Sequence, residues 1–344
     1  MKLVKTEEAV GHVLCHDITQ IIPGKKKGPV FKKGHVVTDE DIPVLLSVGK
    51  ESLYIWEKQE GMLHEDEAAL ILCDICTGDS KDFTASEPSE GKITISAAVD
   101  GLLKIDTERL KAVNSLGQMM IATVHGNFPV KKGDKLAGTR IIPLVIEEEK
   151  MDRAVSLVKD SPLMRILPFK EIKAGIVTTG NEVAKGLIKD AFGPVLKSKL
   201  SEYSVPVMGQ KILSDDAEGI TEAIMRFARE GADMVLVSGG MSVDPDDRTP
   251  KAIKDTGADI ISYGAPTLPG AMFLLSYLEH EGRTIPVLGL PGCVMYARRT
   301  VFDLVLPRVL AGERLTADDL TSYGEGGMCL SCEECHFPNC GFGK

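Results

Sequence analysis

The chain has 344 residues, 43% of them hydrophobic and 26% charged, which is typical of a globular protein with two or three domains. Its formal net charge is −10, with no long basic run and a single tryptophan, so a nucleic-acid partner is not expected. No apolar segment reaches the roughly 20 residues of a membrane span, and the first residues lack the apolar core of a secretory signal, so we expect a cytoplasmic protein without a membrane partner.

Residues 1–60 are expected to form an N-terminal segment of short apolar runs separated by glycines and lysines. Thr38 has the residue type and position of a helix cap, because acidic residues follow it and Gly49 marks the predicted helix end. Residues 53–56 are predicted to be a strand. The lysines around Gly28 are more typical of a solvated hairpin tip than of an anion site.

Residues 61–150 alternate strand-like apolar runs with turn signals, which predicts a mainly β domain. A helix-like stretch covers residues 66–73, and here Cys73 and Cys76 have the spacing of a redox or metal pair. Their neighbours are apolar, which favours two buried core thiols instead. Acidic residues then begin a predicted linking helix, and residues 151–164 lead to the next domain.

From residue 165 to 315 the pattern changes to strands that alternate with amphipathic helices. The predicted strands are 172–177, 207–213 and 234–238, and the predicted helices are 190–203, a helix from the Asp215–Asp216 cap to Glu230, and 295–310. This order predicts a largely parallel sheet with helices on both faces, a three-layer α/β/α domain. Ligands of such domains bind at the carboxyl ends of the strands.

Two polar loops follow predicted strands, Thr178-Thr179-Gly180 and Ser238-Gly239-Gly240. Glycine has no Cβ, so its N–H can approach an anion closely. Three carboxylates follow the second loop, at Asp244, Asp246 and Asp247, and they repel one another unless a cation or hydrogen-bond donors hold them. The pattern indicates a phosphate cradle beside Mg²⁺, or alternatively a polar turn with solvated acids.

Two further loops place a Pro-Gly pair beside a predicted strand, and together the four loops resemble the molybdopterin-binding domain of molybdenum-cofactor biosynthesis proteins. That family includes molybdopterin adenylyltransferases and molybdopterin molybdotransferases. The residues that carry the resemblance are Thr178-Thr179-Gly180-Asn181-Glu182-Val183, Ser238-Gly239-Gly240-Met241-Ser242-Val243, Asp247-Arg248-Thr249-Pro250, Leu268-Pro269-Gly270 and Leu290-Pro291-Gly292. Residues 9–14, 17–19 and 33–35 also look like the start of a molybdotransferase, whereas the resemblance over 61–150 is much weaker.

The resemblance implies a pterin ligand with a dithiolene and a terminal phosphate. It implies Mg²⁺-dependent chemistry at Asp247, which we expect to be catalytic with Asp244 as a helper and Asp246 as a metal ligand. The residues expected to contact the cofactor are Thr178, Thr179, Gly180, Asn181, Glu182, Ser238, Gly239, Gly240, Met241, Ser242, Pro269, Gly270, Pro291, Gly292 and Cys293. A homo-oligomer and delivery to a molybdo- or tungstoenzyme are expected by analogy only.

Three positions depart from the molybdotransferase pattern: Asn181 replaces an aspartate, Ala271 a lysine and Cys293 an asparagine. An amide is no base and a poorer metal ligand than a carboxylate, and Ala271 removes a cation expected near molybdate. These departures favour binding over metal insertion. Two hypotheses therefore stay open, a molybdotransferase-like transferase and a non-catalytic molybdopterin carrier or sensor.

Residues 316–344 form a cysteine-rich tail with thiols at Cys329, Cys332, Cys335 and Cys340. In a reducing compartment, thiols this dense predict one metal centre. The spacing of two, two and four is near an iron–sulfur run, and zinc tolerates many spacings, so an iron–sulfur cluster and Zn²⁺ are both expected occupants. A pair of disulfides or a disordered tail are the alternatives.

Overall fold

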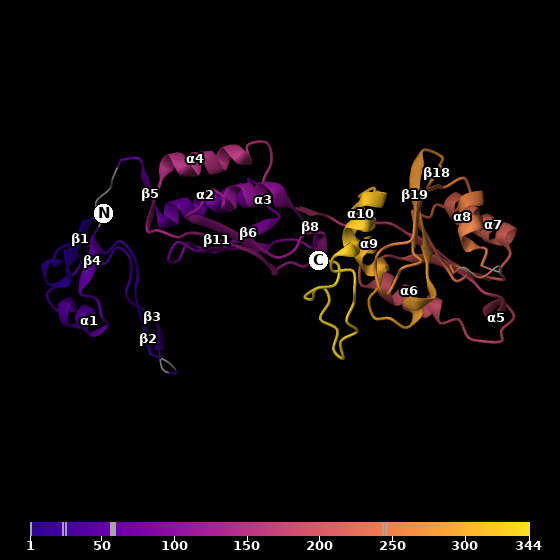
Figure 1. Cartoon of the computed structure of the whole chain (residues 1–344), viewed down its shortest axis with the longest axis horizontal. Helices are drawn as coiled ribbons and strands as arrows, with labels where there is room; N and C mark the ends of the chain where they lie inside the picture. The colour runs from indigo at the N-terminus through magenta and orange to yellow at the C-terminus, as the bar shows by residue number, and fades with distance from the viewer. Residues whose placement is uncertain (1, 23, 25, 56–59, 243, 245–246) are drawn as a thin grey trace. The chain divides into compact units, whose positions relative to one another are not determined.

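The protein is described from a computed structural model, which covers residues 2–22, 24, 26–55, 60–242, 244 and 247–344. The chain divides into two compact units (Figure 1). The first unit comprises Met1–Val99, Ile105–Val124 and Lys132–Arg165, and the second comprises Asp100–Lys104, His125–Lys131 and Ile166–Lys344. Among the described residues, no helix combines the length and the apolar character that crossing a membrane requires.

The N-terminal part of the first unit packs short strands and helices around a small core. Strand β1 (Lys2–Lys5) pairs antiparallel with β4 (Ser52–Ile55), and β2 (Ile18–Ile22) pairs with β3 (Lys26–Phe31); η1 (Thr6–Glu8) and α1 (Asp41–Ser47) complete it. The predicted strand at 53–56 is confirmed through Ile55, and Trp56 lies outside the described residues. The predicted helix begins later than expected, because Thr38 donates both its N–H and its hydroxyl to the Asp41 carboxylate instead of capping the next turn.

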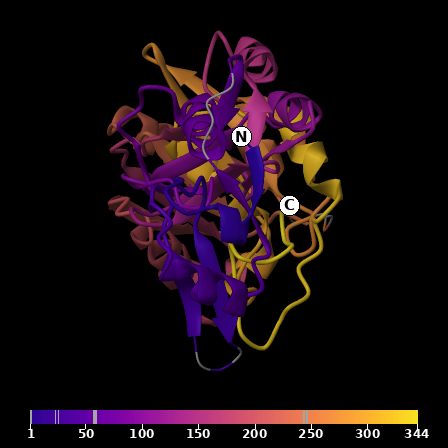
Figure 2. The same cartoon turned by 90° about the vertical axis from the view of Figure 1, so that its left-hand side faces the viewer.

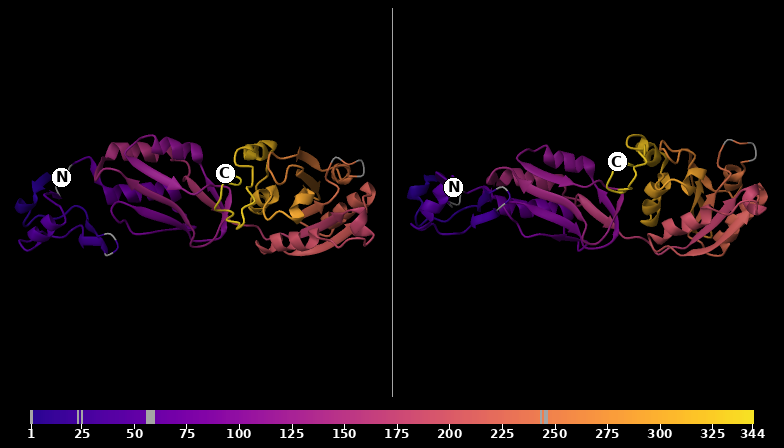
Figure 3. Two further views of the ribbon diagram at one scale, coloured as in Figure 1. Left: turned by 60° about the horizontal axis from the view of Figure 1, so that its bottom comes forward. Right: turned by 90° about the horizontal axis from the view of Figure 1, so that it is seen from below.

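The rest of the first unit is a four-stranded antiparallel sheet with helices on one side (Figures 1 and 3). The sheet has the order β6 (Phe83–Ala85), β7 (Ile93–Ala97), β11 (Lys135–Ile141) and β9 (Met119–Thr123), and β5 (Met62–His64) pairs with β12 (Val145–Glu147). The helices are α2 (Glu65–Thr77), α3 (Thr107–Asn114) and α4 (Glu148–Leu157). Helix α3 has no counterpart among the predicted elements; Asp106 caps it by accepting from the Arg109 N–H.

The second unit is built on a six-stranded sheet, which confirms the predicted α/β fold. Its order is β15 (Val207–Leu213), β14 (Ala174–Thr179), β16 (Met234–Ser238), β19 (Arg283–Leu290), β18 (Leu274–His280) and β17 (Asp259–Tyr263). The first four strands run parallel to one another, β18 is antiparallel to its neighbour β19, and β17 is antiparallel to β18. A smaller sheet joins β10 (Phe128–Val130), β8 (Gly101–Ile105) and β13 (Met164–Leu167).

Helices cover both faces of the six-stranded sheet, because its central strands are apolar on both sides. The helices are α5 (Asn181–Ala184), α6 (Phe192–Ser201), α7 (Ala217–Arg229), α8 (Thr249–Asp255), α9 (Val301–Leu310) and α10 (Ala317–Thr321), with η2 (Gly292–Met295) and η3 (Ser322–Gly324). Ile176 of β14 packs in the core that includes α6 and α9, whereas its neighbour Val177 packs in the core that includes α7 and α8. Successive residues of a strand face opposite sides, so this division produces the three layers.

The predicted long helix over residues 295–310 is wrong. The chain forms the short η2, then irregular backbone, and α9 begins only at Val301. Thr300 ends the irregular stretch as an N-cap: its hydroxyl accepts from the Phe302 N–H, and the Asp303 carboxylate accepts from the Thr300 N–H at 2.7 Å. This reciprocal capping box starts a new helix at Val301, so the helix does not continue from residue 295.

Candidate functional site

A cavity of about 560 Å³ lies where strands β16 and β19 end. Three loops that are distant in sequence form its wall: the loop after β16, the loop before β18 and the segment after β19. The lining residues are Gly239, Gly240, Met241, Ser242, Asp247, Leu268, Pro269, Gly270, Ala271, Met272, Pro291, Gly292, Cys293, Met295 and Tyr296. Three of the four predicted loops therefore meet in one hollow.

The loop after β16 has a backbone that only glycine fits. Gly239 has φ +91°, and a Cβ there would lie 2.2 Å from the carbonyl oxygen of Thr179. Gly240 has φ +56°, and its Cβ would lie 2.8 Å from the Thr249 hydroxyl oxygen. Thr249 fastens the loop, because its hydroxyl donates to the Gly239 carbonyl at 2.8 Å and its N–H donates to the Gly240 carbonyl at 3.2 Å. The loop is thus fixed by close packing and capping.

Asp247 supplies the only charged side chain among the described residues that line the cavity. Its carboxylate accepts from the Ser242 N–H at 2.7 Å, and its own N–H donates to the Asp244 carbonyl at 2.9 Å. Asp244 is exposed and does not belong to the lining, and Asp246 lies outside the described residues. Nearby, Tyr263 donates its hydroxyl to the Met241 carbonyl at 2.8 Å, and burial, with the negative charge of Asp247, raises the tyrosine pKa.

The predicted contacts at the ends of β14 and β16 are buried side chains. Thr178 is fully buried and its hydroxyl accepts from the Gln210 amide at 3.0 Å, while the buried Ser238 hydroxyl lies 3.4 Å from it. The Thr179 hydroxyl is 3.2 Å from that of Thr249. These three side chains support the loop after β16, whereas they are not among the residues that line the cavity.

Gly180, Asn181 and Glu182 begin the short helix α5 and are likewise outside the cavity lining. The Asn181 N–H donates to the Asp215 carboxylate at 3.0 Å, and the other carboxylate oxygen of Asp215 would be 3.5 Å from a Cβ on Gly240. Asp215 thus holds the first loop by this bond and lies beside Gly240 of the loop after β16. The sequence identified Asp215 and Asp216 only as a helix cap, a role that Asp216 alone performs by accepting from the Gly219 N–H at 2.9 Å.

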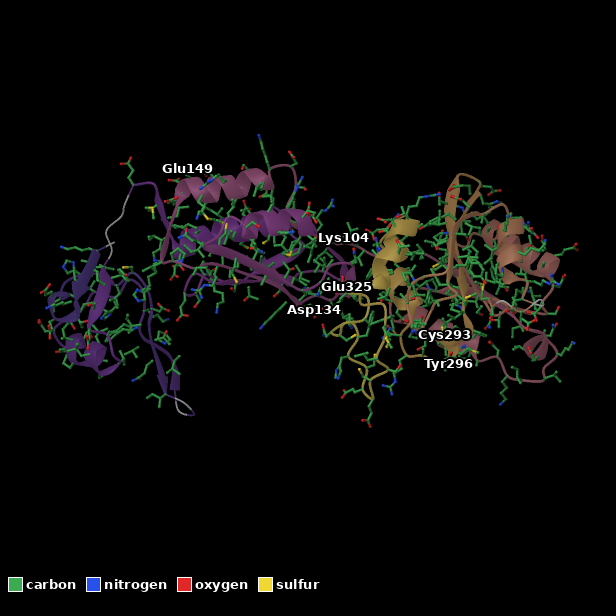
Figure 4. The ribbon with its side chains drawn as sticks, in the orientation of Figure 1. Lys104, Asp134, Glu149, Cys293, Tyr296 and Glu325 are labelled. Atoms are coloured by element: carbon green, nitrogen blue, oxygen red, sulfur yellow. The ribbon has the colours of Figure 1, made fainter. Side chains whose placement is uncertain are left out.

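The segment after β19 presents a thiol and an exposed aromatic ring to the cavity (Figure 4). Cys293 is half-buried, and burial raises the pKa of its thiol above the ordinary value of about 9, so the thiol is protonated at neutral pH. Tyr296 is 79% exposed and was not predicted as a site residue; it stood inside the expected helix. The wall also includes the unpredicted Leu268 and Met272. Apart from Asp247, the described lining is uncharged.

A buried ion network holds the chain between η2 and α9. Lys199 lies 2.6 Å from the Asp303 carboxylate, and both side chains are almost fully buried. Arg299 bridges Asp303 and Glu202 at 2.9 Å each. Lys199 also donates to the Arg298 carbonyl at 2.9 Å. The network fixes residues 298–303 directly after the cavity segment.

Residues 325–344, all of which the structure describes, contain no helix or strand (Figure 2). Cys329 and Cys340 are half-buried and pack against the core of the second unit, while Cys332 and Cys335 are exposed. Within the described part of the chain, no three His, Cys, Asp or Glu side chains are gathered to hold a metal ion. The predicted metal ligands of the tail are therefore present but are not brought together.

Comparison with known families matches two parts of the chain. Residues 175–311 match a family described as a probable molybdopterin binding domain, and residues 3–57 match a family described as a domain of unknown function. The first match confirms the resemblance drawn from the four loops. It covers the six-stranded sheet and every loop that lines the cavity.

Individual relatives share only part of the chain. A molybdenum cofactor biosynthesis bifunctional protein of Synechococcus elongatus is 31% identical over 85 residues, 25% of this chain and 27% of that protein. A CinA-like protein of Mycolicibacterium vanbaalenii is 41% identical over 78 residues, 22% of this chain and 18% of its own length. Among solved structures, the tungsten cofactor synthesizing protein MoaB from Pyrococcus furiosus is 25% identical with a TM-score of 0.32, over 36% of this chain and 84% of that one.

Proposed function

We propose that this chain, whose residues 175–311 are a domain of the molybdopterin-binding family, binds molybdopterin or adenylylated molybdopterin during molybdenum or tungsten cofactor biosynthesis. The observation that carries the proposal is the convergence of three loops on the single cavity at the ends of β16 and β19. That position is where α/β sheets bind ligands. The chain aligns with less than a third of the length of the curated relatives named above, so its place in the pathway is part of the proposal.

The two halves of the cavity suit the two halves of such a ligand. Gly239 and Gly240 line one part of the cavity, where they offer backbone and no side chain, and a turn of this kind suits a terminal phosphate. The wall formed by Met272, Cys293 and Tyr296 is uncharged and consists of polarisable sulfur-containing and aromatic side chains. Such a wall suits a pterin ring and its dithiolene sulfurs. An apolar wall with a few placed polar groups is typical of small-molecule sites.

Asp247 fits a hard cation at the phosphate end. One of its oxygens accepts from the Ser242 N–H, which leaves lone pairs for Mg²⁺, and no cationic side chain occurs in the described lining to neutralise the phosphate instead. A bound Mg²⁺ supplies charge neutralisation at the phosphate oxygens. Asp247 itself would hold the cation beside the phosphate through its free carboxylate lone pairs. The exposed Asp244 would assist it.

The lining favours a binding role over insertion of molybdate. Ala271 and Met272 provide no positive charge, and the thiol of Cys293 is neutral at pH 7. An oxyanion such as molybdate would meet only neutral donors in the described lining, namely backbone N–H groups and the side chains of Ser242, Cys293 and Tyr296. A molybdotransferase-like transferase is therefore the second candidate, which the family and Asp247 favour.

Anaerobic titration calorimetry with molybdopterin tests binding. The wild type is expected to release heat and Gly239→Ala to release none, because its Cβ collides with the Thr179 carbonyl oxygen. Gly282→Ala is the matched control: Gly282 also has positive φ, +74°, but nothing lies within 4 Å of its Cβ position. An absence of heat from the wild type contradicts the proposal.

Turnover separates the two candidates. Mg²⁺-dependent release of AMP from adenylylated molybdopterin and molybdate, lost in Asp247→Asn and kept in the exposed Asp255→Asn, identifies the transferase. Tight binding without product identifies the carrier or sensor. Assembly into a homo-oligomer and transfer to a molybdo- or tungstoenzyme stay predictions of the same proposal.

The tail supports a second proposed role, as a thiolate metal site for zinc or an iron–sulfur cluster. Its donor set suits both, but its geometry requires the exposed Cys332 and Cys335 to close on Cys329 and Cys340. Metal analysis of anaerobically purified protein tests it. A brown protein with visible absorbance indicates iron and sulfide, a colourless zinc-loaded protein indicates zinc, and a metal-free protein contradicts the role.

A further inference from the structure

The start of the cysteine tail is bonded to one loop of the cavity. The Leu268 N–H donates to the Gly327 carbonyl at 2.8 Å, and the Cys329 N–H donates to the Leu268 carbonyl at 2.8 Å. Met328 therefore forms a parallel bridge with Leu268. Leu268 itself lines the cavity. Leu268 thus pairs with the tail through its backbone and also lines the proposed ligand site.

The pairing is held in place by close packing of the tail. A Cβ on Gly327 would lie 2.3 Å from both the Pro266 and the Tyr323 carbonyl oxygens, so the tail backbone fits directly against the chain that leads to Leu268. Gly326 in turn accepts from the Gly343 N–H at 2.9 Å, which closes the two ends of the tail on each other. This part of the tail is therefore in direct contact with residues 266–268.

A second attachment joins the tail to the chain after the third cavity loop. Arg298 donates to the Glu333 carbonyl at 2.6 Å, and the Arg299 guanidinium lies 5.0 Å from the centre of the Phe337 ring. The same Arg299 belongs to the ion network that fixes the chain between η2 and α9. The tail is therefore fastened to segments that carry two of the three cavity loops.

The thiols are distributed around these attachments. Cys329 is at the Leu268 pairing, Cys332 and Cys335 flank the Glu333 attachment, and Cys340 packs on the core. Cys340 also lines a hollow of about 800 Å³. Gathering four thiolates on one ion changes the path of the tail between its two attachments.

We propose that the cavity and the tail are coupled: metal loading of the four tail thiols tightens ligand binding by ordering the tail segment around Met328 that pairs with Leu268. The proposal rests on the proposed functions of cavity and tail and adds the regulation of one by the other. Coupling of this kind is reciprocal, so the pterin also tightens metal binding. The expected change in ligand affinity is about 5- to 150-fold, the usual range for coupled sites.

Zinc titration of the reduced, metal-free full-length chain tests the coupling without any pterin. Hydrogen–deuterium exchange of residues 266–272 is expected to slow when Zn²⁺ binds. The double variant Cys332→Ser/Cys335→Ser loses this response, since both side chains are exposed and their replacement does not disturb the core. Cys73→Ser on α2 of the first unit is the control and responds as the wild type does.

A glycine pair separates metal binding from its transmission. Gly327→Ala keeps all four thiols and binds Zn²⁺, but it disrupts the packing on Pro266, so zinc no longer slows exchange at 266–272 or raises molybdopterin affinity. Gly341→Ala, in the same tail with nothing within 4 Å of its Cβ, keeps both effects. Zinc that does not bind, or that binds without changing exchange at 266–272, overturns the coupling. A normal exchange response without molybdopterin binding contradicts only the proposed ligand.

Discussion

The cavity and the cysteine tail of the second unit relate sequence to space in opposite ways. The cavity takes its wall from residues between Gly239 and Tyr296 that meet in one hollow. The four tail cysteines lie between residues 329 and 340 and nevertheless form no metal-holding group in the described chain. The difference teaches that a hydrogen-bonded sheet brings distant loops together, whereas close spacing alone does not gather side chains in a segment without regular structure.

The sheet achieves this because parallel strands end at the same edge. Ser238 of β16 is level with Leu290 of β19 and Thr178 of β14, so the loops that follow all three begin side by side. In the tail, backbone bonds to Leu268 and Gly343 set the path at a few points only. The two regions therefore differ in how much of their geometry exists before a ligand or metal arrives, and variants of each test that difference.

The largest effect is expected from the ion network that supports the cavity segment. Asp303→Ala removes the partner of buried Lys199 and the capping contact to Thr300, and loss of one member of a buried pair costs about 3–5 kcal/mol. Chemical denaturation of the full chain measures the loss in free energy of unfolding. Asp255→Ala, which removes an exposed ion pair with Lys251, is the control and should change it by less than about 0.5 kcal/mol.

A smaller loss is expected from Gly239→Ala. The left-handed backbone alone costs a non-glycine residue about 1–2 kcal/mol, and the collision with Thr179 adds to it. Gly282→Ala carries the cost of the left-handed backbone but not that of a collision, because nothing lies within 4 Å of its Cβ position. Denaturation of both variants isolates the contribution of the collision. Equal losses in the free energy of unfolding would mean that the loop after β16 shifts to accept the new Cβ. The cavity would then be less preformed than its packing indicates.

The sequence predicted the sheet and the cavity loops because their signals are local and additive. Apolar runs, the Asp216 cap and glycine pairs each indicated one element, and the parallel order placed the loops at one edge. It did not predict that Thr178 and Ser238 are buried and support the loop after β16. A polar residue at a strand end gives the same sequence signal whether its side chain faces a ligand or a neighbouring strand. Asp215 was missed since two adjacent aspartates share one capping signal.

The break between η2 and α9 was missed for a different reason. Residues 301–310 are buried all round and continue the apolar pattern, while the capping box of Thr300 and Asp303 depends on a carboxylate that Lys199, remote in sequence, also holds. A long-range ion pair has no signature in local sequence. Tyr296 was missed through the same error, because it had been assigned to the interior of a continuous helix.

A pH-dependent loss in the free energy of unfolding is expected from the carboxylates that bind Arg308, between α9 and α10. Burial acts to raise the pKa values of Glu313 and Asp319, but hydrogen bonds, including those from Arg308 to both, lower them below their ordinary values. The stabilisation is therefore present above the ordinary pKa values of about 4 and is lost as the pH falls through the lowered ones. Urea denaturation at neutral and acid pH should show this loss, reduced in Glu313→Gln. An unchanged pH dependence in that variant would exclude Glu313 as its source.

The smallest effect on stability is expected in the tail, where Cys332→Ser/Cys335→Ser should change the free energy of unfolding by less than about 0.5 kcal/mol, as is usual for surface positions. The contrast lies in reactivity. Alkylation needs an accessible thiolate, so iodoacetamide at neutral pH should modify exposed Cys332 and Cys335 first, Cys293 more slowly because burial raises its pKa, and fully buried Cys76 last. Mass spectrometry over time gives the order. Early protection of Cys332 and Cys335 in the reduced, metal-free protein would mean that the tail is already gathered, and the contrast between the two regions would then fail.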